Sequence, residues 1–216
     1  MTPAPKLSVG LLLTAAAGFI DAIGFIELGG FYTSFMSGNT TQLGDALANG
    51  IWPTALLTTS LVLLFFLGSV AGSALALTDR RWGPVGALAL VLLALSTAFA
   101  LTLAGYPPPQ TMLALAVAAG AQNAVLLSEG SVRLGATFVT GTLFAAGQDL
   151  ARALRREAPP WRWAQHLLVW ASLLAGAALG ALGYRAMDIY ALALPLAVYA
   201  AFLLGFVLLG PRAVKL

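Results

Sequence analysis

Residues 34–47 read Ser-Phe-Met-Ser-Gly-Asn-Thr-Thr-Gln-Leu-Gly-Asp-Ala-Leu, a polar stretch between two apolar runs. A related stretch at residues 137–150 reads Thr-Phe-Val-Thr-Gly-Thr-Leu-Phe-Ala-Ala-Gly-Gln-Asp-Leu. At a constant offset the two stretches share four identical residues and two that carry a hydroxyl group. The matching pairs are Phe35 and Phe138, Gly38 and Gly141, Gly44 and Gly147, Leu47 and Leu150, Ser34 and Thr137, and Ser37 and Thr140. The chain therefore uses one kind of polar stretch twice.

The composition indicates the class of protein. Of the 216 residues, 60% are hydrophobic and 9% are charged, and the mean hydropathy is +0.90. A soluble domain carries about 25% charged residues, so we expect an integral membrane protein in a lipid bilayer. The chain has no cysteine and one histidine, His166, so neither a metal site nor a cofactor is expected. The basic residues are scattered beside apolar runs, a pattern typical of membrane orientation and not of nucleic-acid binding.

Six apolar runs are long enough to cross a membrane, since a helix needs about 20 apolar residues to cross a hydrocarbon core of about 30 Å. They are residues 7–28, 53–77, 84–105, 110–128, 163–184 and 189–209. The first run also resembles a signal peptide, with Lys6 ahead of it. Its counterpart at residues 110–128 favours a membrane span instead.

The basic residues predict the orientation. With six spans, ten of the 11 basic residues lie on the side of the amino terminus, and only Arg185 lies on the other side. The positive-inside rule then places both termini in the cytoplasm. If the two polar stretches also crossed the membrane, the Arg80–Arg81 pair and the basic cluster at 152–162 would lie on opposite sides. The charges therefore favour six spans over eight.

The similarity between the two halves extends beyond the polar stretches. Further matches at constant offsets are Ala16 and Ala118, Ala17 and Ala119, Gly18 and Gly120, Asp21 and Asn123, Ala22 and Ala124, and Glu27 and Glu129. The motif Gly68-x-x-x-Gly72 matches Gly176-x-x-x-Gly180. Such motifs pack helices together, either within one chain or between the copies of a homodimer.

Each repeat unit contains three spans, an odd number, so the second unit enters the membrane from the opposite side. The predicted fold is an all-α integral membrane protein with six transmembrane helices in an inverted 3+3 repeat. Its units are residues 7–105 and 110–210 of a single membrane domain, residues 1–216. The alternative is chance similarity between two segments rich in alanine, glycine and leucine.

Each polar stretch is expected to form a short helix, at residues 40–48 and 142–154. Nine residues at 1.5 Å each reach about 13 Å, roughly half of the hydrocarbon core. We therefore interpret both stretches as re-entrant half-helices that enter from opposite faces and approach each other inside the membrane. The alternative is a pair of amphipathic helices that lie at the membrane surface.

The expected half-helices have residues suited to their beginnings. Ser37 or Asn39 can cap the first helix, and Thr140 can cap the second. Gly38 and Gly141 would supply backbone freedom for the preceding turn. The free N–H groups at such helix starts can hold an anion or a carbonyl oxygen.

Asp21 is the exceptional residue within a span. An intramembrane carboxylate is costly and indicates a functional site. The central parts of the spans contain no lysine or arginine, so neutral donors to Asp21 are expected. These are Asn39, Thr40, Gln122 and Asn123. The alternative is that Asp21 only joins two helices by a hydrogen bond.

The predicted substrate-binding residues combine Asp21 with the starts of both half-helices. They are Asp21, Gly38, Asn39, Thr40, Gln122, Asn123, Thr140, Gly141 and Thr142. Three acids are candidates for coupling transport to protons, although the last two could simply be solvated at span ends. They are Asp21, Glu27 and Glu129. His166 is expected at the membrane interface, at the start of its span.

Two segments resemble a known family. Ala-Gly-Phe-Ile-Asp-Ala at residues 17–22 and Phe-Met-Ser-Gly-Asn-Thr-Thr at residues 35–41 are similar to the YoaK-like family of bacterial membrane proteins. The resemblance implies an inner-membrane protein with about six helices and no established activity. It supplies neither a substrate nor catalytic residues.

The function expected from these features is that of a small-solute or ion transporter or channel. The repeat, the paired polar stretches and the intramembrane acid motivate this hypothesis. The alternative is a membrane scaffold or sensor without transport activity. An enzyme is not expected, because the sequence shows no nucleophile–base pair, metal cluster or phosphate-binding loop.

Overall fold

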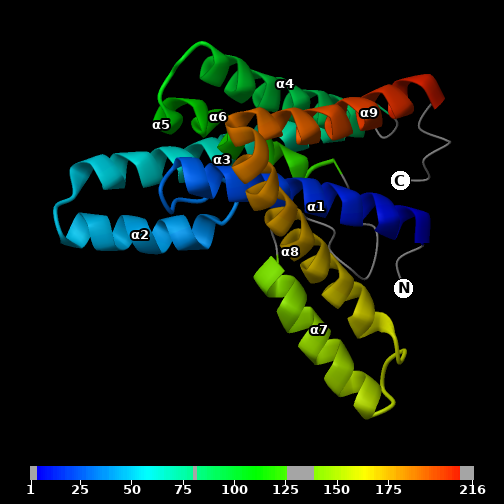
Figure 1. Ribbon diagram of the computed structural model, residues 1–216. Coiled ribbons are helices and arrows are strands. Elements are labelled where there is room, and N and C mark those ends of the chain that lie inside the picture. The colour runs from blue at the N-terminus through cyan, green and yellow to red at the C-terminus, as the bar shows by residue number, and fades with distance from the viewer. Residues whose placement is uncertain (1–3, 80–81, 126–138, 210–216) are drawn as a thin grey trace.

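The computed structural model describes residues 4–79, 82–125 and 139–209, and these residues form helices and connecting turns without any strand. The elements are α1 (Ala4–Glu27), α2 (Met36–Ala48), α3 (Trp52–Thr78), α4 (Gly83–Leu103), α5 (Pro108–Thr111), α6 (Leu113–Gln122), α7 (Val139–Leu154), α8 (Arg162–Met187), the 3-10 helix η1 (Asp188–Leu192) and α9 (Ala193–Leu209). Figure 1 shows their arrangement.

Four helical stretches are long and apolar enough to cross a membrane. They are Leu7–Glu27, Trp52–Thr78, Gly83–Leu103 and Arg162–Leu208. The last contains α8, η1 and α9, and its 47 residues bend sharply after α8, where Asp188 has a φ of 55°. Large apolar side chains on these helices are exposed, as contact with lipid requires. Examples are Leu56, Phe66, Leu77, Leu93, Leu179 and Leu208. The chain is an all-α membrane protein.

The apolar runs of the sequence correspond closely to the long helices. The run at 53–77 is α3, and the run at 163–184 is α8. The run at 110–128 differs, because the helix is divided into the short α5 and the ten-residue α6. Three consecutive prolines at 107–109 start this segment, and a proline ring fits only the first turn of a helix.

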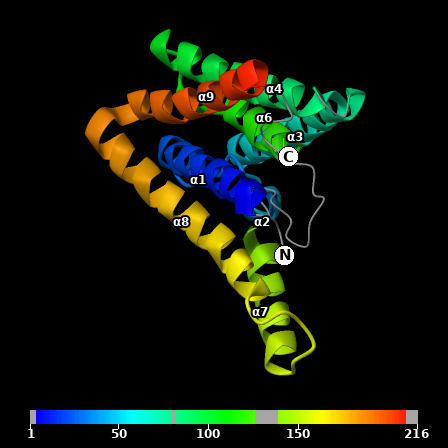
Figure 2. The same cartoon turned by 90° about the vertical axis from the view of Figure 1, so that its right-hand side faces the viewer.

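The beginning of α1 and the end of α9 lie at the same end of the molecule in both views (Figures 1 and 2). The turn between α2 and α3 and the connection from α4 to α5 lie at the opposite end (Figure 1).

Helix α1 packs against α8 through glycines that allow direct backbone contact. A Cβ atom at Gly18 would collide with the carbonyl oxygen of Leu173, and one at Gly176 would collide with the carbonyl oxygen of Ala15. Small residues of this kind let two membrane helices approach closely. The Gly176-x-x-x-Gly180 motif is therefore used within the chain.

Helix α6 packs against α3 through equivalent glycines. A Cβ atom at Gly120 would collide with the carbonyl oxygen of Phe65, and one at Gly68 would collide with that of Val117. These contacts are equivalent to those between α1 and α8. Adding 102 to a residue number on α1 gives the matching residue on α6, and subtracting 108 from a residue number on α8 gives the matching residue on α3. In both cases a helix near the beginning of one half, α1 or α6, contacts a helix of the other half, α8 or α3.

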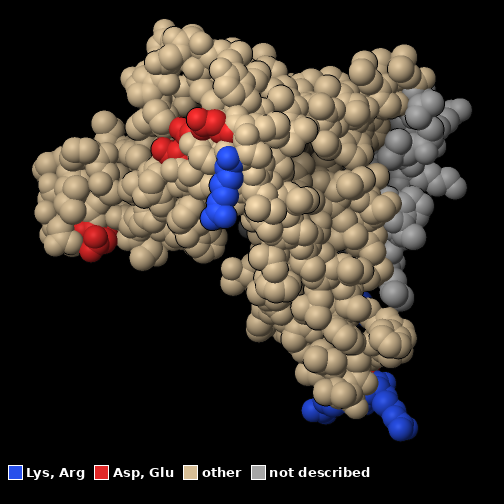
Figure 3. All heavy atoms as spheres, in the orientation of Figure 1, with Lys and Arg blue, Asp and Glu red and all other residues tan. Residues whose placement is uncertain are grey.

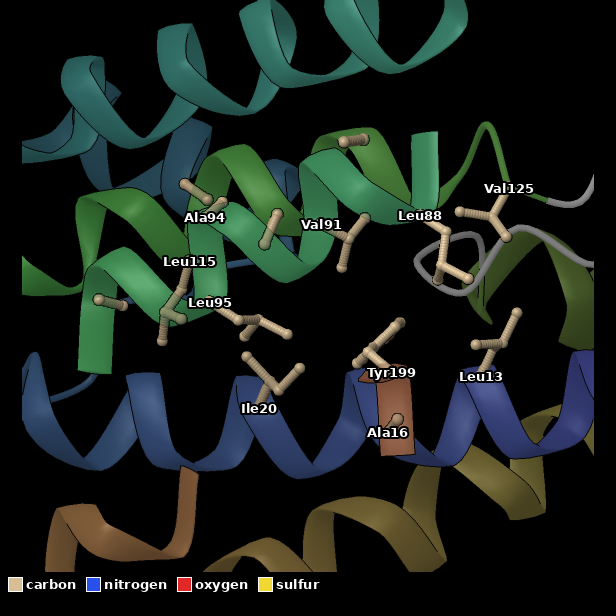
Figure 4. Close-up of a cluster of buried hydrophobic side chains, with 14 of the residues drawn as sticks. Leu13, Ala16, Ile20, Leu88, Val91, Ala94, Leu95, Leu115, Val125 and Tyr199 are labelled. Carbon is tan, nitrogen blue, oxygen red and sulfur yellow. The ribbon is translucent and has the colours of Figure 1, made fainter. Parts of the chain in front are cut away.

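Helices α4 and α9 cover the other side of α1 and α6 and enclose the apolar core. Figure 4 shows side chains from these helices pointing toward one another. The labelled core residues are Leu13, Ala16, Ile20, Leu88, Val91, Ala94, Leu95, Leu115, Val125 and Tyr199. The core is therefore shared between the two halves of the chain.

The polar stretches form helices α2 and α7, which lie along α3 and α8 respectively (Figure 1). Both helices begin earlier than expected, at Met36 and at Val139. Gly38 and Gly141 therefore lie inside helices, and the prediction that they supply a flexible turn was wrong. Gly38 instead gives room for the ring of Phe35, which would collide with a Cβ atom there.

We expect the glycines between the long helices to be sensitive to substitution. Gly18→Ala and Gly120→Ala should each destabilise the protein by about 1–3 kcal/mol, because the added methyl group meets backbone that cannot move aside. Gly205→Ala in α9 is the matched control, since its Cβ position is open. Thermal unfolding in detergent micelles measures the difference. Equal melting temperatures for all three variants would contradict this packing.

Candidate functional site

Asp21, on α1, fixes the loop that follows its own helix. Its Oδ1 atom accepts hydrogen bonds from the backbone N–H of Thr33 at 2.9 Å, the Thr33 hydroxyl at 2.9 Å and the backbone N–H of Ser34 at 2.8 Å. The donors come from the α1–α2 loop, residues 28–35. The sequence predicted that Asn39 donates to Asp21. This prediction was wrong, because Asn39 bonds to Tyr32 instead.

The sequence around Asp21 explains why the loop returns to it. Gly24 lies one turn after Asp21 and receives the methyl group of Thr33, which a side chain at position 24 would exclude. Gly29 and Gly30 have φ values of 65° and 110°, which allow the chain to reverse direction after α1. The carboxylate then lies beside the first residues of α2, where a negative charge favours the helix dipole.

Asn39, on α2, fixes the same loop from its other side. Its side chain is buried, donates from Nδ2 to the carbonyl oxygen of Tyr32 at 2.7 Å and accepts at Oδ1 from the N–H of Tyr32 at 3.0 Å. Gln42, one turn later, donates to the carbonyl oxygen of Gly30 at 3.0 Å. Asp21 and Asn39 therefore hold the α1–α2 loop between two helices.

Three adjoining cavities surround this loop. The large cavity, of about 530 Å³, lies between α1, α8 and the loop. It is lined by Gly18, Asp21, Ala22, Phe25, Ile26, Tyr32, Leu173, Ala177, Ala181 and Arg185. The middle cavity, of about 360 Å³, adds the start of α7. It is lined by Asp21, Tyr32, Ser34, Phe35, Val139, Thr140, Leu143, Trp170 and Leu173.

The small cavity, of about 270 Å³, lies between the starts of α2 and α7. It is lined by Ser34, Phe35, Met36, Ser37, Phe65, Thr140 and Gly141. The cavities share wall residues: Asp21 and Tyr32 separate the large from the middle cavity, and Phe35 and Thr140 separate the middle from the small one. Together they form a chain of spaces that begins at Arg185 and ends between the two polar helices.

The remaining predicted site residues have local or internal partners. Thr40 donates to the carbonyl oxygen of Met36 at 2.7 Å, and Asn123 donates to that of Ala119 at 3.1 Å. Gln122 is buried and donates to the carbonyl oxygen of Leu13 at 3.0 Å.

The prediction that Thr40 and Gln122 donate hydrogen bonds to Asp21 was therefore wrong. Thr142 is buried in α7 and Thr140 is exposed to the cavities. Thus the starts of α2 and α7 meet near Asp21, whereas Gln122 lies in the helix core.

The acidic residues predicted to couple transport to protons differ in their surroundings. Glu27, at the end of α1, accepts a 2.6 Å hydrogen bond from the hydroxyl of Tyr184, so it is held by α8. Glu129 lies outside the described residues. Of the two candidates that the structure describes, Asp21 lines the large and middle cavities and Glu27 lines neither.

A second polar cluster joins α7 to α8, and the sequence analysis did not identify it. Asp149 is buried and accepts hydrogen bonds from Arg162, one of them from Nε at 2.6 Å. His166, near the start of α8, is also buried, with Nε2 3.3 Å from Asp149. The spacing of four residues between Arg162 and His166 on one helix face was the available signal.

The Arg162 guanidinium holds the pKa of Asp149 below its ordinary value, chiefly through the hydrogen bonds between them. The ionised carboxylate therefore attaches α7 to α8. Within the described ranges no group of three or more acidic, histidine or cysteine side chains is placed to hold a metal ion.

The chain belongs to the family described as "Protein of unknown function (DUF1275)", whose model matches residues 9–206. It is 35% identical over 197 residues to the UPF0700 transmembrane protein RA0705 of Rhizobium meliloti, covering 88% of this chain and 83% of the relative. It is 26% identical over 149 residues to the UPF0700 transmembrane protein YoaK of Bacillus subtilis, covering 66% of each. The resemblance to the YoaK-like family is confirmed. No solved structure matches the chain.

We expect Asp149→Asn to loosen the hairpin of α7 and α8. The variant leaves the Arg162 cation without its carboxylate partner and should lower the melting temperature in detergent by several degrees. Asp45→Asn is the matched control, because Asp45 is exposed on α2. A melting temperature unchanged by Asp149→Asn would show that the ion pair contributes nothing.

The pH dependence of this effect follows from the direction of the pKa shift. Because folding lowers the pKa of Asp149, its contribution is complete above the ordinary value of 3.8 and is lost only as the pH falls through the lower folded value. The difference between the wild type and Asp149→Asn should therefore persist from about pH 8 to about pH 5. A difference that disappears by pH 5 would contradict an Asp149 held in its ionised form.

Proposed function

We propose that this protein is a small-solute or ion transporter or channel, without enzymatic activity, whose pathway follows the three cavities around Asp21. The single observation that carries the proposal is that these cavities adjoin one another, sharing wall residues from the large cavity at Arg185 to the small cavity at the starts of α2 and α7. Polar side chains from several helices line spaces that an ordinary helix bundle would fill with apolar ones. Such cavities between helices are common sites for small molecules.

The proposed architecture is an inverted 3+3 repeat of six spans in the bacterial inner membrane, with both termini in the cytoplasm. The matched glycine contacts support it, because α1 meets α8 as α6 meets α3, at equivalent residues. Repeats related in this way place substrate sites at the interface between the two units. The cavities lie at this interface, between the α1–α2 loop of one unit and α7 of the other.

We further propose that α2 and α7 are re-entrant half-helices. Met36 and Ser37, at the start of α2, share the small cavity with Phe65, which lies midway along the 27-residue α3. The start of α7 shares the middle cavity with Leu173, near the middle of α8. If α3 and α8 cross the bilayer, both helix starts lie near its centre.

The exposed polar side chains of α2 are compatible with this depth. The hydroxyl groups of Thr40 and Thr41 donate to carbonyl oxygens one turn earlier, at 2.7 and 3.1 Å. A hydroxyl whose hydrogen is bonded within its own helix can face lipid at a reduced cost. The alternative, a helix lying on the membrane surface, does not account for a start that shares a cavity with Phe65.

Asp21 has a defined part in the proposed mechanism. Its hydrogen bonds hold Thr33 and Ser34, and the neighbouring Tyr32 forms the wall between the large and middle cavities. Protonation of the carboxylate or competition by a solute would weaken these bonds and free Thr33 and Ser34, which follow Tyr32 in the loop. Asp21 would thus couple occupancy of the site to opening of the pathway.

A scaffold or sensor without transport activity is the competing function. It would use the same close helix packing but would need no passage from one cavity to the next. A flux measurement therefore separates the two functions.

The test closes the proposed pathway with a disulfide in this cysteine-free chain. Ser37→Cys combined with Gly141→Cys places one thiol on each side of the small cavity. The purified variant, in liposomes, is assayed by light scattering for entry of glycerol, urea, methylammonium and formate. Oxidation should reduce the entry of whichever solute crosses by at least about tenfold, and a reducing agent should restore it.

The matched control is Gly44→Cys combined with Gly147→Cys, which lie seven residues after Ser37 and six residues after Gly141 in the same two helices and face open space. Oxidation of this variant should leave solute entry unchanged. If wild-type liposomes admit none of the four solutes faster than empty liposomes, the scaffold or sensor function is favoured. If disulfide formation at Ser37 and Gly141 leaves an observed flux intact, the pathway lies elsewhere.

A further inference from the structure

We propose that the large and middle cavities bind a small organic ammonium ion beside Asp21, between aromatic rings. The inference rests on the proposed function and names the chemical class of its substrate. It depends on three features of the described residues: a carboxylate with remaining acceptor capacity, aromatic walls on both sides of it, and the balance of charge at the open end of the large cavity.

The carboxylate of Asp21 is the central feature. Three bonds from Thr33 and Ser34 end at Oδ1, and the Ser34 side chain also bonds to the carboxylate, so Oδ2 carries fewer of these bonds than Oδ1. The residue is only half-buried and lines both the large and the middle cavity. A cation in either cavity can therefore reach the carboxylate without displacing the loop entirely.

Aromatic rings surround this carboxylate. The rings of Phe25 and Tyr32 are 5.0 Å apart, and those of Tyr32 and Phe35 are 5.1 Å apart in an edge-to-face arrangement. Phe25 and Tyr32 line the large cavity, while Tyr32, Phe35 and Trp170 line the middle one. Aromatic faces attract organic cations, and quaternary ammonium ions are bound in cages of this composition. A hydrated metal ion would gain little from such walls, so an organic cation fits better.

The charges at the open end of the large cavity also favour a cation. Glu27 and Asp188 lie beside the hydroxyl of Tyr184, the residue before Arg185, and Arg185 itself lines the large cavity. Figure 3 shows acidic side chains near one basic side chain in this part of the surface, whereas other basic side chains gather at the tip of α7 and α8. Two acids against one base attract cations toward the cavity.

The beginnings of α2 and α7 present an opposing influence, because helix starts favour anions. Each start is equivalent to about half a positive charge. When ionised, Asp21 places a full negative charge next to the start of α2, where it accepts a hydrogen bond from Ser34, two residues before that helix. The net field near Asp21 therefore favours a cation, while an anion would have to displace or approach the carboxylate.

The test uses the full-length protein in detergent and choline as the probe. Binding is measured by isothermal titration calorimetry against 3,3-dimethylbutan-1-ol, which has the shape of choline without its charge, and against acetate. Choline should bind at least about tenfold more tightly than either. A neutral alcohol that binds as tightly as choline, or tighter binding of acetate, would overturn the proposal.

Variants then locate the site. Asp21→Asn should weaken choline binding by at least about tenfold, while Asp45→Asn, an exposed acid outside both cavities, should leave it unchanged. Because Asp21 also holds the loop, Trp170→Leu provides a second variant, since Trp170 has no role in that loop and lines the middle cavity. It should weaken choline binding by about fivefold. Unchanged affinity in both Asp21→Asn and Trp170→Leu would exclude this site.

These experiments test the ammonium site and the transport function independently of each other. Choline binding that depends on Asp21 and Trp170 without any solute flux supports the ammonium site and removes the transport proposal. Flux of glycerol, urea or formate in liposomes without choline binding overturns the ammonium site and leaves the transport proposal standing.

Discussion

The close packing of α1 on α8 and of α6 on α3 is the constraint on which the other features depend. Gly18 and Gly120 bring backbone against backbone, where a single added methyl group would collide with a carbonyl oxygen. In a lipid environment, where water does not drive helices together, such fit supplies much of the association between helices. It joins a helix near the beginning of each half, α1 or α6, to the other half and so creates the interface at which the cavities lie.

The polar helices create a second requirement, because each begins far from either end of the long helix beside it. A helix start in an apolar setting leaves N–H groups that need acceptors. Just before α2, Asp21 accepts from the N–H groups of Thr33 and Ser34, and at the helix start the carbonyl oxygens of Ser34 and Phe35 accept from the N–H groups of Met36 and Asn39. An acid within an apolar helix is thus explained by the backbone groups that it serves.

Much of the helix pattern could be predicted from the sequence, and the details of the site could not. The runs at 53–77 and 163–184 are uninterrupted apolar segments, so their ends fall close to those of α3 and α8. The start of α2 was placed too late because Gly38 suggests a turn, whereas the contact of Phe35 with Gly38 depends on a ring folding back over the helix. The donors to Asp21 were missed for a related reason: a loop that returns to its own helix has no sequence periodicity.

The hydrogen bonds of Asp21 connect the structural role of this residue with its proposed role in transport. A carboxylate that holds the wall of a cavity and also faces into that cavity cannot serve both partners equally, since each new donor weakens the bonds to the others. A solute bound at Asp21 would therefore have different affinities for the states with the α1–α2 loop held and released, and such a difference is what allows a ligand to shift a conformational equilibrium. Asn39 holds Tyr32 independently of Asp21, so the loop would be released at Thr33 and Ser34 while remaining attached to α2. The movement would then be confined to Thr33 and Ser34, beside the wall between the large and middle cavities, and the packing of α1 on α8 would remain unchanged.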